Sequence, residues 1–396
     1  MTGTDNQSCP VCNSPDTDIF LDRRNVPVHQ NLLMPDRDAA RAIRRGDLRL
    51  AYCENCGFIF NTSFDPEKLS YSSDYDNNQS YSSVFHEYIN DLVRGLIDAR
   101  GVKNSRIVEI GCGKGYFLQK LVEDPAAGNT GIGFDPSYIG PLSCCNGRLQ
   151  FQQSNFGPGM EHIPADVVIC RHVIEHIPEP VVFLRSIRAA LENNPHARIF
   201  FETPCVRWIL ENNVIWDFFY EHCSYFFANS LLAAFSRAGF CIEGIVPIFN
   251  GQYLWIEASL KETPAFTDPD GICGMARDYA RDEERMLDSC SNEIIRRADV
   301  GGVALWGAAA KGVTFANLVD PDCRFVSCVV DINPNKQGHY VPGTGHPIVG
   351  PGDLARFGIR SVILMNPNYY DEVCMQLRKE RIEAAVIDPA RGEHCS

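Results

Sequence analysis

The sequence predicts an α/β protein with two Rossmann-like units and a small cysteine-rich module. Two sets of short β-branched runs alternate with helical patterns, one on each side of a Pro- and Asp-containing stretch after residue 260. Such alternation is typical of parallel, doubly wound sheets. Residues 1–75, in contrast, hold two Cys-x-x-Cys pairs and little periodicity. We therefore predict three parts, with boundaries at 1–75, 76–262 and 263–396.

The composition excludes several classes of partner. The 396 residues carry a formal net charge of −14, and a field of that sign repels phosphate backbones and anionic lipid. No apolar run reaches the ~18 residues of a membrane span, and residues 1–10 lack the pattern of a secretory signal. The odd count of 17 cysteines favours reduced thiols over a disulfide framework. We expect a cytoplasmic protein that binds neither nucleic acid nor membrane.

Four cysteines of the first part predict a metal site. Cys9 and Cys12 form one pair, Cys53 and Cys56 form the other, and each pair has a turn-forming Pro or Gly beside it. Two intervening residues let both sulfurs of a pair face one point, and four thiolates complete a tetrahedral zinc site with no open position. The alternatives are unrelated thiols or a redox pair, but no thioredoxin-like unit surrounds these residues. We predict structural zinc.

A glycine-rich loop follows the first predicted strand of the second part. That strand runs into Gly111, Gly113 and Gly115, and a helix begins after Tyr116. Glycines let the backbone approach a ligand closely, but the dinucleotide fingerprint has its third glycine three residues after the second, not two. The pattern from Glu109 onward instead resembles motif I of the class I S-adenosylmethionine (SAM) methyltransferases. The resemblance implies that these five residues hold SAM.

Two later strand ends agree with that resemblance. One is followed by Asp135, an acid that can accept hydrogen bonds from ribose hydroxyls, and by Pro136. Another is followed by Arg171 and His172. The resemblance implies that these four residues line the methyl-donor pocket, and the glycine spacing disfavours the alternative of an NAD site. The predicted strands of this part are 106–110, 130–134, 166–170 and 198–202.

The run from His172 to His176 also matches H-x-x-E-H, an inverted zinc-peptidase motif. That chemistry needs a continuous helix, which places both histidines on one face. Here a predicted strand ends just before the motif, and Pro178 and Pro180 follow it. Because proline breaks a helix interior, we expect only a short turn and no catalytic metal here.

A second chemical candidate is the run Tyr220, Glu221 and His222 inside an aromatic stretch. A histidine beside a carboxylate can be tuned as a general base near neutral pH. The alternative is a helix start with aromatic packing below it. An upstream Tyr-rich segment contains Tyr71, Tyr75 and Tyr81.

Together these features resemble the SAM-dependent C-methyltransferases of nucleotide-linked 4-keto deoxysugars. That family combines an N-terminal zinc module, a methyltransferase domain with a Tyr-Glu-His motif, and a C-terminal α/β domain. With this resemblance we expect that His222 is the base, that Glu221 orients it or assists it, and that Tyr75 or Tyr220 stabilises an oxyanion. An O- or N-methyltransferase for another polar small molecule, and a noncatalytic zinc- and SAM-binding module, remain alternatives.

The third part predicts another strand–loop–helix unit, with a loop that holds only two glycines, Gly307 and Gly312. A nucleotide site, an NAD site and a scaffold are all compatible with so degenerate a loop. The resemblance implies a sugar-nucleotide cleft, for which Lys311, Lys336 and His339 supply candidate cations. A diphosphate ligand requires this cleft to be locally basic. The predicted strands are 303–306, 325–330, 361–365 and 384–388.

Overall fold

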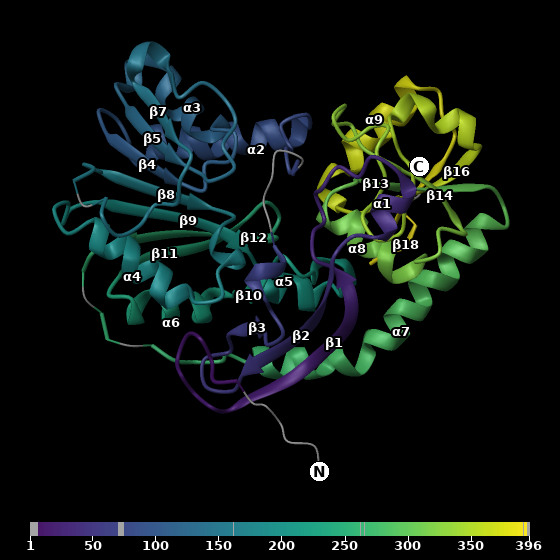
Figure 1. The fold of residues 1–396 in the computed structure, drawn as a ribbon, viewed down its shortest axis with the longest axis horizontal. Coiled ribbons are helices and arrows are strands. Elements are labelled where there is room, and N and C mark those ends of the chain that lie inside the picture. Colours follow the sequence, from purple (N-terminus) through teal and green to yellow (C-terminus); the bar gives the residue numbers. More distant parts are fainter. Residues whose placement is uncertain are drawn as a thin grey trace.

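Three β-sheets form the frame of the protein (Figure 1). The computed structural model describes residues 7–69, 75–160, 162–261, 263–264, 266–390 and 392–393. A four-stranded sheet carries the N-terminal part, an eight-stranded sheet the middle of the chain, and a six-stranded sheet the C-terminal part. The predicted α/β class is confirmed.

The N-terminal sheet has the order β1-β2-β3-β10 and is antiparallel. Its last strand comes from the middle of the chain: β10 starts two residues after His222 and pairs with β3. The Tyr-Glu-His segment is therefore anchored on the cysteine-bearing part of the protein. The elements are β1 (Thr17–Pro27), α1 (Arg37–Arg41), β2 (Arg45–Cys53), β3 (Ile59–Asn61) and β10 (Ser224–Tyr225).

The central sheet has the order β11-β12-β9-β8-β4-β5-β7-β6. The four predicted strands β9, β8, β4 and β5 are parallel, and so is β7, which was not predicted. The remaining strands, which were not predicted, are antiparallel, because β12 pairs with β9, β11 with β12 and β6 with β7 in that orientation. The strands are β4 (Arg106–Ile110), β5 (Thr130–Phe134), β6 (Ser143–Cys144), β7 (Leu149–Gln152), β8 (Val167–Arg171), β9 (Arg198–Pro204), β11 (Cys241–Ile248) and β12 (Tyr253–Ser259).

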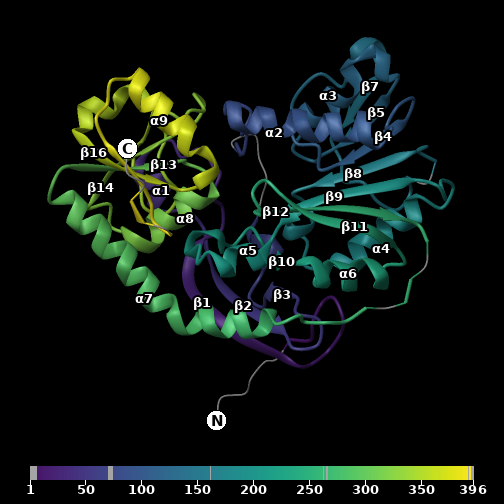
Figure 2. The same cartoon turned by 180° about the vertical axis from the view of Figure 1, so that it is seen from behind.

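Helices pack on both faces of this sheet and over its edge (Figures 1 and 2). They are α2 (Ser83–Arg94), α3 (Tyr116–Glu123), α4 (Pro180–Ala190), α5 (Val206–Glu211) and α6 (Ala228–Arg237).

The C-terminal sheet has the order β15-β14-β13-β16-β17-β18. The 27-residue helix α7 leads into it and packs against β1 on the way, where Arg23 pairs with Glu283 at 2.8 Å. The elements are α7 (Ile272–Ala298), β13 (Gly302–Trp306), α8 (Ala310–Val319), β14 (Val326–Val330), β15 (Ile348–Val349), β16 (Ile359–Leu364), α9 (Tyr370–Lys379), β17 (Ala385–Asp388) and β18 (Gly392–Glu393).

Helix α2 joins the two larger sheets. Its N-terminal residues Ser82 and Ser83 meet Glu372 of α9, whose carboxylate accepts from both hydroxyls at 2.6 and 3.1 Å and from the Ser83 amide at 2.8 Å. A carboxylate suits the positive end of a helix dipole. Within the described residues, no helix has the length and apolarity needed to cross a membrane.

Candidate active site

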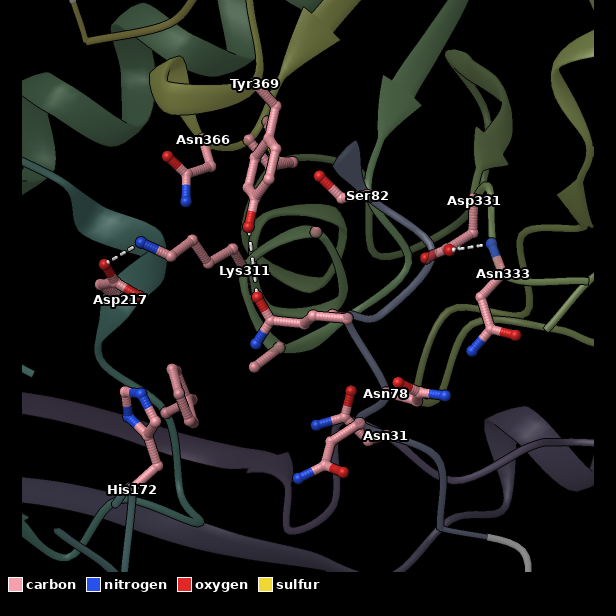
Figure 3. Close-up of a pocket in the computed structure, with 18 of the residues that line it drawn as sticks. Asn31, Asn78, Ser82, His172, Asp217, Lys311, Asp331, Asn333, Asn366 and Tyr369 are labelled. Atoms are coloured by element: carbon pink, nitrogen blue, oxygen red, sulfur yellow. Dashed lines mark hydrogen bonds and ion pairs between the residues drawn. The ribbon is translucent and has the colours of Figure 1, made fainter. Parts of the chain in front are cut away.

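A cavity of about 280 Å³ lies where the three parts meet. Figure 3 shows Lys311 reaching Asp217, with His172 and Asn31 across the open space from Tyr369. The strand ends of the two Rossmann-like sheets and the segment 75–82 all contribute to the lining. Its amides and carboxylates are Asn31, Asn77, Asn78, Gln79, Gln252, Asn333, Asn366, Glu175, Asp217, Glu221, Asp331 and Glu372.

His222 lines this cavity, as a base for a bound substrate would. Its ring packs on Phe219, with ring centroids 4.1 Å apart, and meets the ring of His176 edge-on at 4.8 Å. Burial, helped by the neighbouring His176, lowers the pKa of His222 well below its ordinary value. The imidazole is therefore neutral near pH 7 and can accept a proton.

Glu221 does not orient His222, contrary to the sequence-based expectation. Its carboxylate is buried and lies 3.3 Å from Nδ1 of His29, and it accepts a hydrogen bond from the Gln30 amide at 3.0 Å. The backbone carbonyl of Glu221 instead lies 2.8 Å from Nδ1 of His176. Nothing in the sequence signalled His29, which lies 192 residues away.

The two candidate tyrosines lie in different places. Tyr75 lines the cavity, and its hydroxyl accepts a hydrogen bond from the Asn31 side chain at 3.4 Å. Tyr220 is not among the lining residues, because its hydroxyl accepts from the Asp65 amide at 2.9 Å and its ring packs on Gly46. The geometry therefore does not support Tyr220 as an oxyanion donor.

The other tyrosines of the approach segment are only partly described. Tyr81 lines the cavity, whereas Tyr71 lies outside the described residues.

A buried ionic network connects His172 to the central sheet. Glu202 accepts hydrogen bonds from Arg171 at 2.6 Å, from His172 at 2.8 Å and from Tyr88 at 2.6 Å. Burial favours the neutral imidazole, but Glu202 and Glu175 raise the pKa of His172 to about 9. Burial likewise opposes ionisation of Glu202, but Arg171 and His172 hold its pKa below the ordinary range.

Of Arg171 and His172, both predicted to line the methyl-donor pocket, His172 lines the cavity and Arg171 does not; the Arg171 guanidinium lies over the Phe117 ring instead. The sequence-based interpretation missed Glu202, although an acid within the apolar run 198–202 was a usable signal.

The glycine-rich loop fits a closely approaching ligand. Gly111, Gly113 and Gly115 all have positive φ. A Cβ on Gly113 would meet no atom within 4 Å, whereas one on Gly111 would lie 2.2 Å from Val173. Gly113 thus borders open space, and Gly111 is required for packing.

The acids beside the loop are arranged for binding as well. The Asp135 carboxylate accepts hydrogen bonds from the Gly113 amide at 2.8 Å and from Ser137. Pro136, the next residue in the chain, is exposed. Glu109 is buried, and its Oε2 has no hydrogen-bond partner among the described residues. The Tyr116 hydroxyl lies 2.6 Å from Nδ1 of His86 on α2. A buried carboxyl group with one unpartnered oxygen and a glycine that borders open space are compatible with a closely approaching ligand such as SAM.

The four N-terminal cysteines converge. The Sγ atoms of Cys9 and Cys56 lie 3.7 Å apart, those of Cys12 and Cys53 lie 3.4 Å apart, and all four lie within 4.8 Å of one another. All four residues are buried. Zn–S bonds of about 2.3 Å place the sulfurs of a tetrahedral site slightly under 4 Å apart, so the cluster can hold a metal ion.

Glu175, His176 and His222 also bring possible ligand atoms within 4.8 Å of one another. As expected, the H-x-x-E-H run forms a short 3₁₀ turn, Ile174–His176, and not a continuous helix. His172 Nδ1 already lies 3.3 Å from Glu175, and its pKa of about 9 makes it a cation near neutral pH. A metal ion here would face that positive charge.

The cavity is not basic, contrary to the expectation for a diphosphate ligand. Lys311 is paired with Asp217 at 2.5 Å, and Lys336 donates to Asn31 and to the Ala308 carbonyl. His339 is absent from the lining, and no arginine of the described residues is part of it.

Comparisons with known proteins cover both the middle and the C-terminal parts. Residues 83–243 match the methyltransferase domain family, and residues 275–386 match the C-methyltransferase C-terminal domain family. The C-methyltransferase NovU of Streptomyces niveus is 25% identical over 403 aligned residues, which span 92% of this chain and 90% of that protein. A tRNA U34 carboxymethyltransferase of Nautilia profundicola is 28% identical over 26% of this chain and 35% of that protein.

Parts of several solved methyltransferase structures also resemble part of this chain. The dimethyltransferase RosA from Streptomyces davawensis is 20% identical, with a TM-score of 0.35, over 45% of this chain and 54% of its own. The mitomycin 7-O-methyltransferase MmcR is 17% identical, with a TM-score of 0.32, over 44% and 54%. These alignments span about half of each solved chain.

The glycine-rich loop and the methyltransferase domain match define a SAM-dependent methyltransferase. The alignment with NovU extends this likeness to nearly the whole chain, and the C-terminal domain match agrees with it. Together these findings support a SAM-dependent C-methyltransferase family.

Proposed function

We propose that this enzyme C-methylates a nucleotide-linked 4-keto deoxysugar through an enolate. The observation that carries the proposal is the placement of a half-buried, neutral His222 and of Tyr75 on one cavity. His222 removes the proton from the carbon alpha to the ketone, and the C–H electron pair becomes the enolate. Tyr75 donates a hydrogen bond to the oxygen on which charge develops, which is where a preorganised donor is worth most.

SAM, when bound, supplies a sulfonium methyl group to the enolate carbon and leaves as a neutral thioether. We assign its binding to Glu109, the three loop glycines, Tyr116 and Asp135, because the loop offers open space and an unpartnered carboxylate. The ketone re-forms as the new carbon–carbon bond is made, and His222 returns its proton to solvent.

The sugar nucleotide would lie against the C-terminal sheet. Helix α8 begins without a side-chain cap, and Ala309 and Ala310 at its start line the cavity. Helix N-terminal amides bind phosphates without requiring an arginine. A site of this kind is compatible with a lining in which carboxylates outnumber lysines.

We also propose that the four-cysteine cluster holds structural zinc. The converging sulfurs and the Asn55 amide, which donates to Cys12 Sγ at 3.4 Å, support this assignment. With four protein ligands no coordination position is left for a substrate, so the ion would stabilise the fold only.

Solvent exchange tests the proposed reaction. A thymidine-diphosphate-linked 4-keto-6-deoxyhexose is incubated in D₂O with the enzyme and without SAM, and label at the alpha carbon is followed by NMR. The wild type should exchange, and His222→Asn should lose about 100-fold or more in rate, while a His196→Asn control on an exposed histidine should not. Near-wild-type exchange in the His222 variant would overturn its role as base. Methylation without exchange would favour O- or N-methylation.

A further inference from the structure

Lys336 is a buried cation beside the cavity whose purpose the reaction above does not explain. Its side chain is 3% exposed and lines the cavity. Its Nζ donates to Asn31 Oδ1 at 3.2 Å and to the Ala308 carbonyl at 2.9 Å. Burying an ammonium is costly, so a lysine at this place calls for a reason.

Asn31 connects Lys336 to Tyr75. Because an ammonium group has donors and no acceptor, the Asn31 oxygen must face Lys336 and its NH₂ must face the Tyr75 hydroxyl, 3.4 Å away. The Tyr75 oxygen therefore accepts from Asn31, and its own O–H is directed elsewhere.

The backbone holds this arrangement in place. The Asn31 carbonyl accepts from the Asp76 amide at 2.9 Å, and Leu32 forms a β-bridge with Tyr75. Asn335, the neighbour of Lys336, donates to the Asp76 carboxylate at 3.2 Å. Three segments far apart in the sequence thus fix the position of one tyrosine hydroxyl.

We propose that Lys336 is a positioning residue that acts through Asn31 on Tyr75. Its charge polarises the Asn31 amide, and the amide stabilises negative charge that develops at the Tyr75 oxygen as the tyrosine donates to the enolate. Successive hydrogen bonds in a poorly solvated site polarise one another. The inference rests on the proposed function, because it takes Tyr75 as the oxyanion donor.

Two effects of the surroundings on the charge of Lys336 oppose each other. Burial lowers the pKa of Lys336, and the carboxylates of Asp331, Asp76 and Glu221 oppose that shift. The competing role is a direct contact between Lys336 and an anionic group of the substrate.

A double-mutant cycle separates these roles. Lys336→Met, Tyr75→Phe and the double variant are compared in the exchange assay with the thymidine-diphosphate-linked 4-keto-6-deoxyhexose, with exposed Lys379→Met as the control. Lys336→Met should lower kcat about 10- to 100-fold with KM changed by less than about threefold. In the Tyr75→Phe background the same change should cost less than about twofold.

A second variant guards against a loss of folding. Asn31→Asp still accepts from Lys336 but cannot donate to Tyr75, so it should reproduce the loss of kcat while its thermal unfolding stays close to that of the wild type. Additive effects of Lys336→Met and Tyr75→Phe on kcat would overturn the inference. A change confined to KM would also overturn it and would show that Lys336 binds an anionic group of the substrate directly. Wild-type enzyme that exchanges no label refutes the enolate reaction and the relay with it, whereas exchange with additive variants refutes the relay alone.

Discussion

Replacing Glu109 by Gln should stabilise the ligand-free protein at neutral and alkaline pH. Glu109 lies in β4, just before the glycine-rich loop, and is 3% exposed. Its Oε2 has no hydrogen-bond partner among the described residues. Burial raises the pKa of Glu109 from 4.5 to about 8, although the charge of Arg171 opposes the shift.

The size of the effect follows from that pKa. The folded protein keeps a proton that the unfolded chain releases between pH 4.5 and about 8, so stability falls as pH rises through this interval. Each pKa unit corresponds to about 1.4 kcal/mol. Relative to a variant that cannot ionise, the wild type should therefore lose about 3 kcal/mol between pH 5 and pH 8.

Urea unfolding of both proteins at pH 5, 6, 7 and 8 measures this difference. Comparing the two across pH cancels the fixed contribution of the Gln amide. Glu123→Gln serves as the control, because Glu123 lies nearby on α3 with 47% of its side chain exposed. We also expect Glu109→Gln to weaken SAM binding about tenfold, since the carboxylate is placed for a cationic group. A stability difference that does not grow with pH would refute the reasoning.

Three further predictions concern the loop, the cysteine cluster and α2. Gly113→Ala should lose about 1 kcal/mol of stability, because its φ is positive, and should bind SAM at least about tenfold more weakly by calorimetry, because its methyl enters open space. Gly111→Ala should lose about 1–3 kcal/mol more, because its methyl also clashes with Val173. Cys53→Ser should abolish zinc retention in elemental analysis and lower the melting temperature, and a chelator should then have no further effect, unlike in the wild type. The three hydrogen bonds of Glu372 hold the start of α2, so Glu372→Ala should lose about 1–3 kcal/mol of stability and raise KM for the acceptor without changing SAM affinity. An unchanged KM would show that this contact does not shape the substrate cavity.

Local sequence patterns predicted the parallel strands well. The predicted strands 106–110 and 130–134 coincide with β4 and β5, because a β-branched run that ends in glycines or an acid defines both ends of a buried strand. The antiparallel β11 and β12 were not foreseen. Their pairing with β9 depends on contacts across the sheet and leaves no short-range signal.

The site was predicted in its residue types better than in its contacts. Tyr220, Glu221 and His222 are adjacent in sequence, so a shared role was a natural hypothesis. In the fold, Tyr220 bonds to Asp65, Glu221 pairs with His29, and only His222 and Glu221 line the cavity. Adjacent side chains in an irregular segment point in different directions, and which partner each one meets depends on elements more than 150 residues away.

The strand pairing of the N-terminal sheet connects the cysteine cluster to His222, although no cysteine of the cluster lines the cavity. Cys56 lies three residues before β3, and β3 pairs with β10, which starts two residues after His222. Loosening the cluster would release β3, then β10, and with it the backbone that positions His222. Because misplacing a reacting group by about 1 Å can cost about 100-fold in rate, a purely structural ion would control turnover. Metal loss should therefore lower kcat and the stability of the methyltransferase domain together, since the four cysteines and Phe60 of β3 share one hydrophobic core with Val108 and Ile110 of β4.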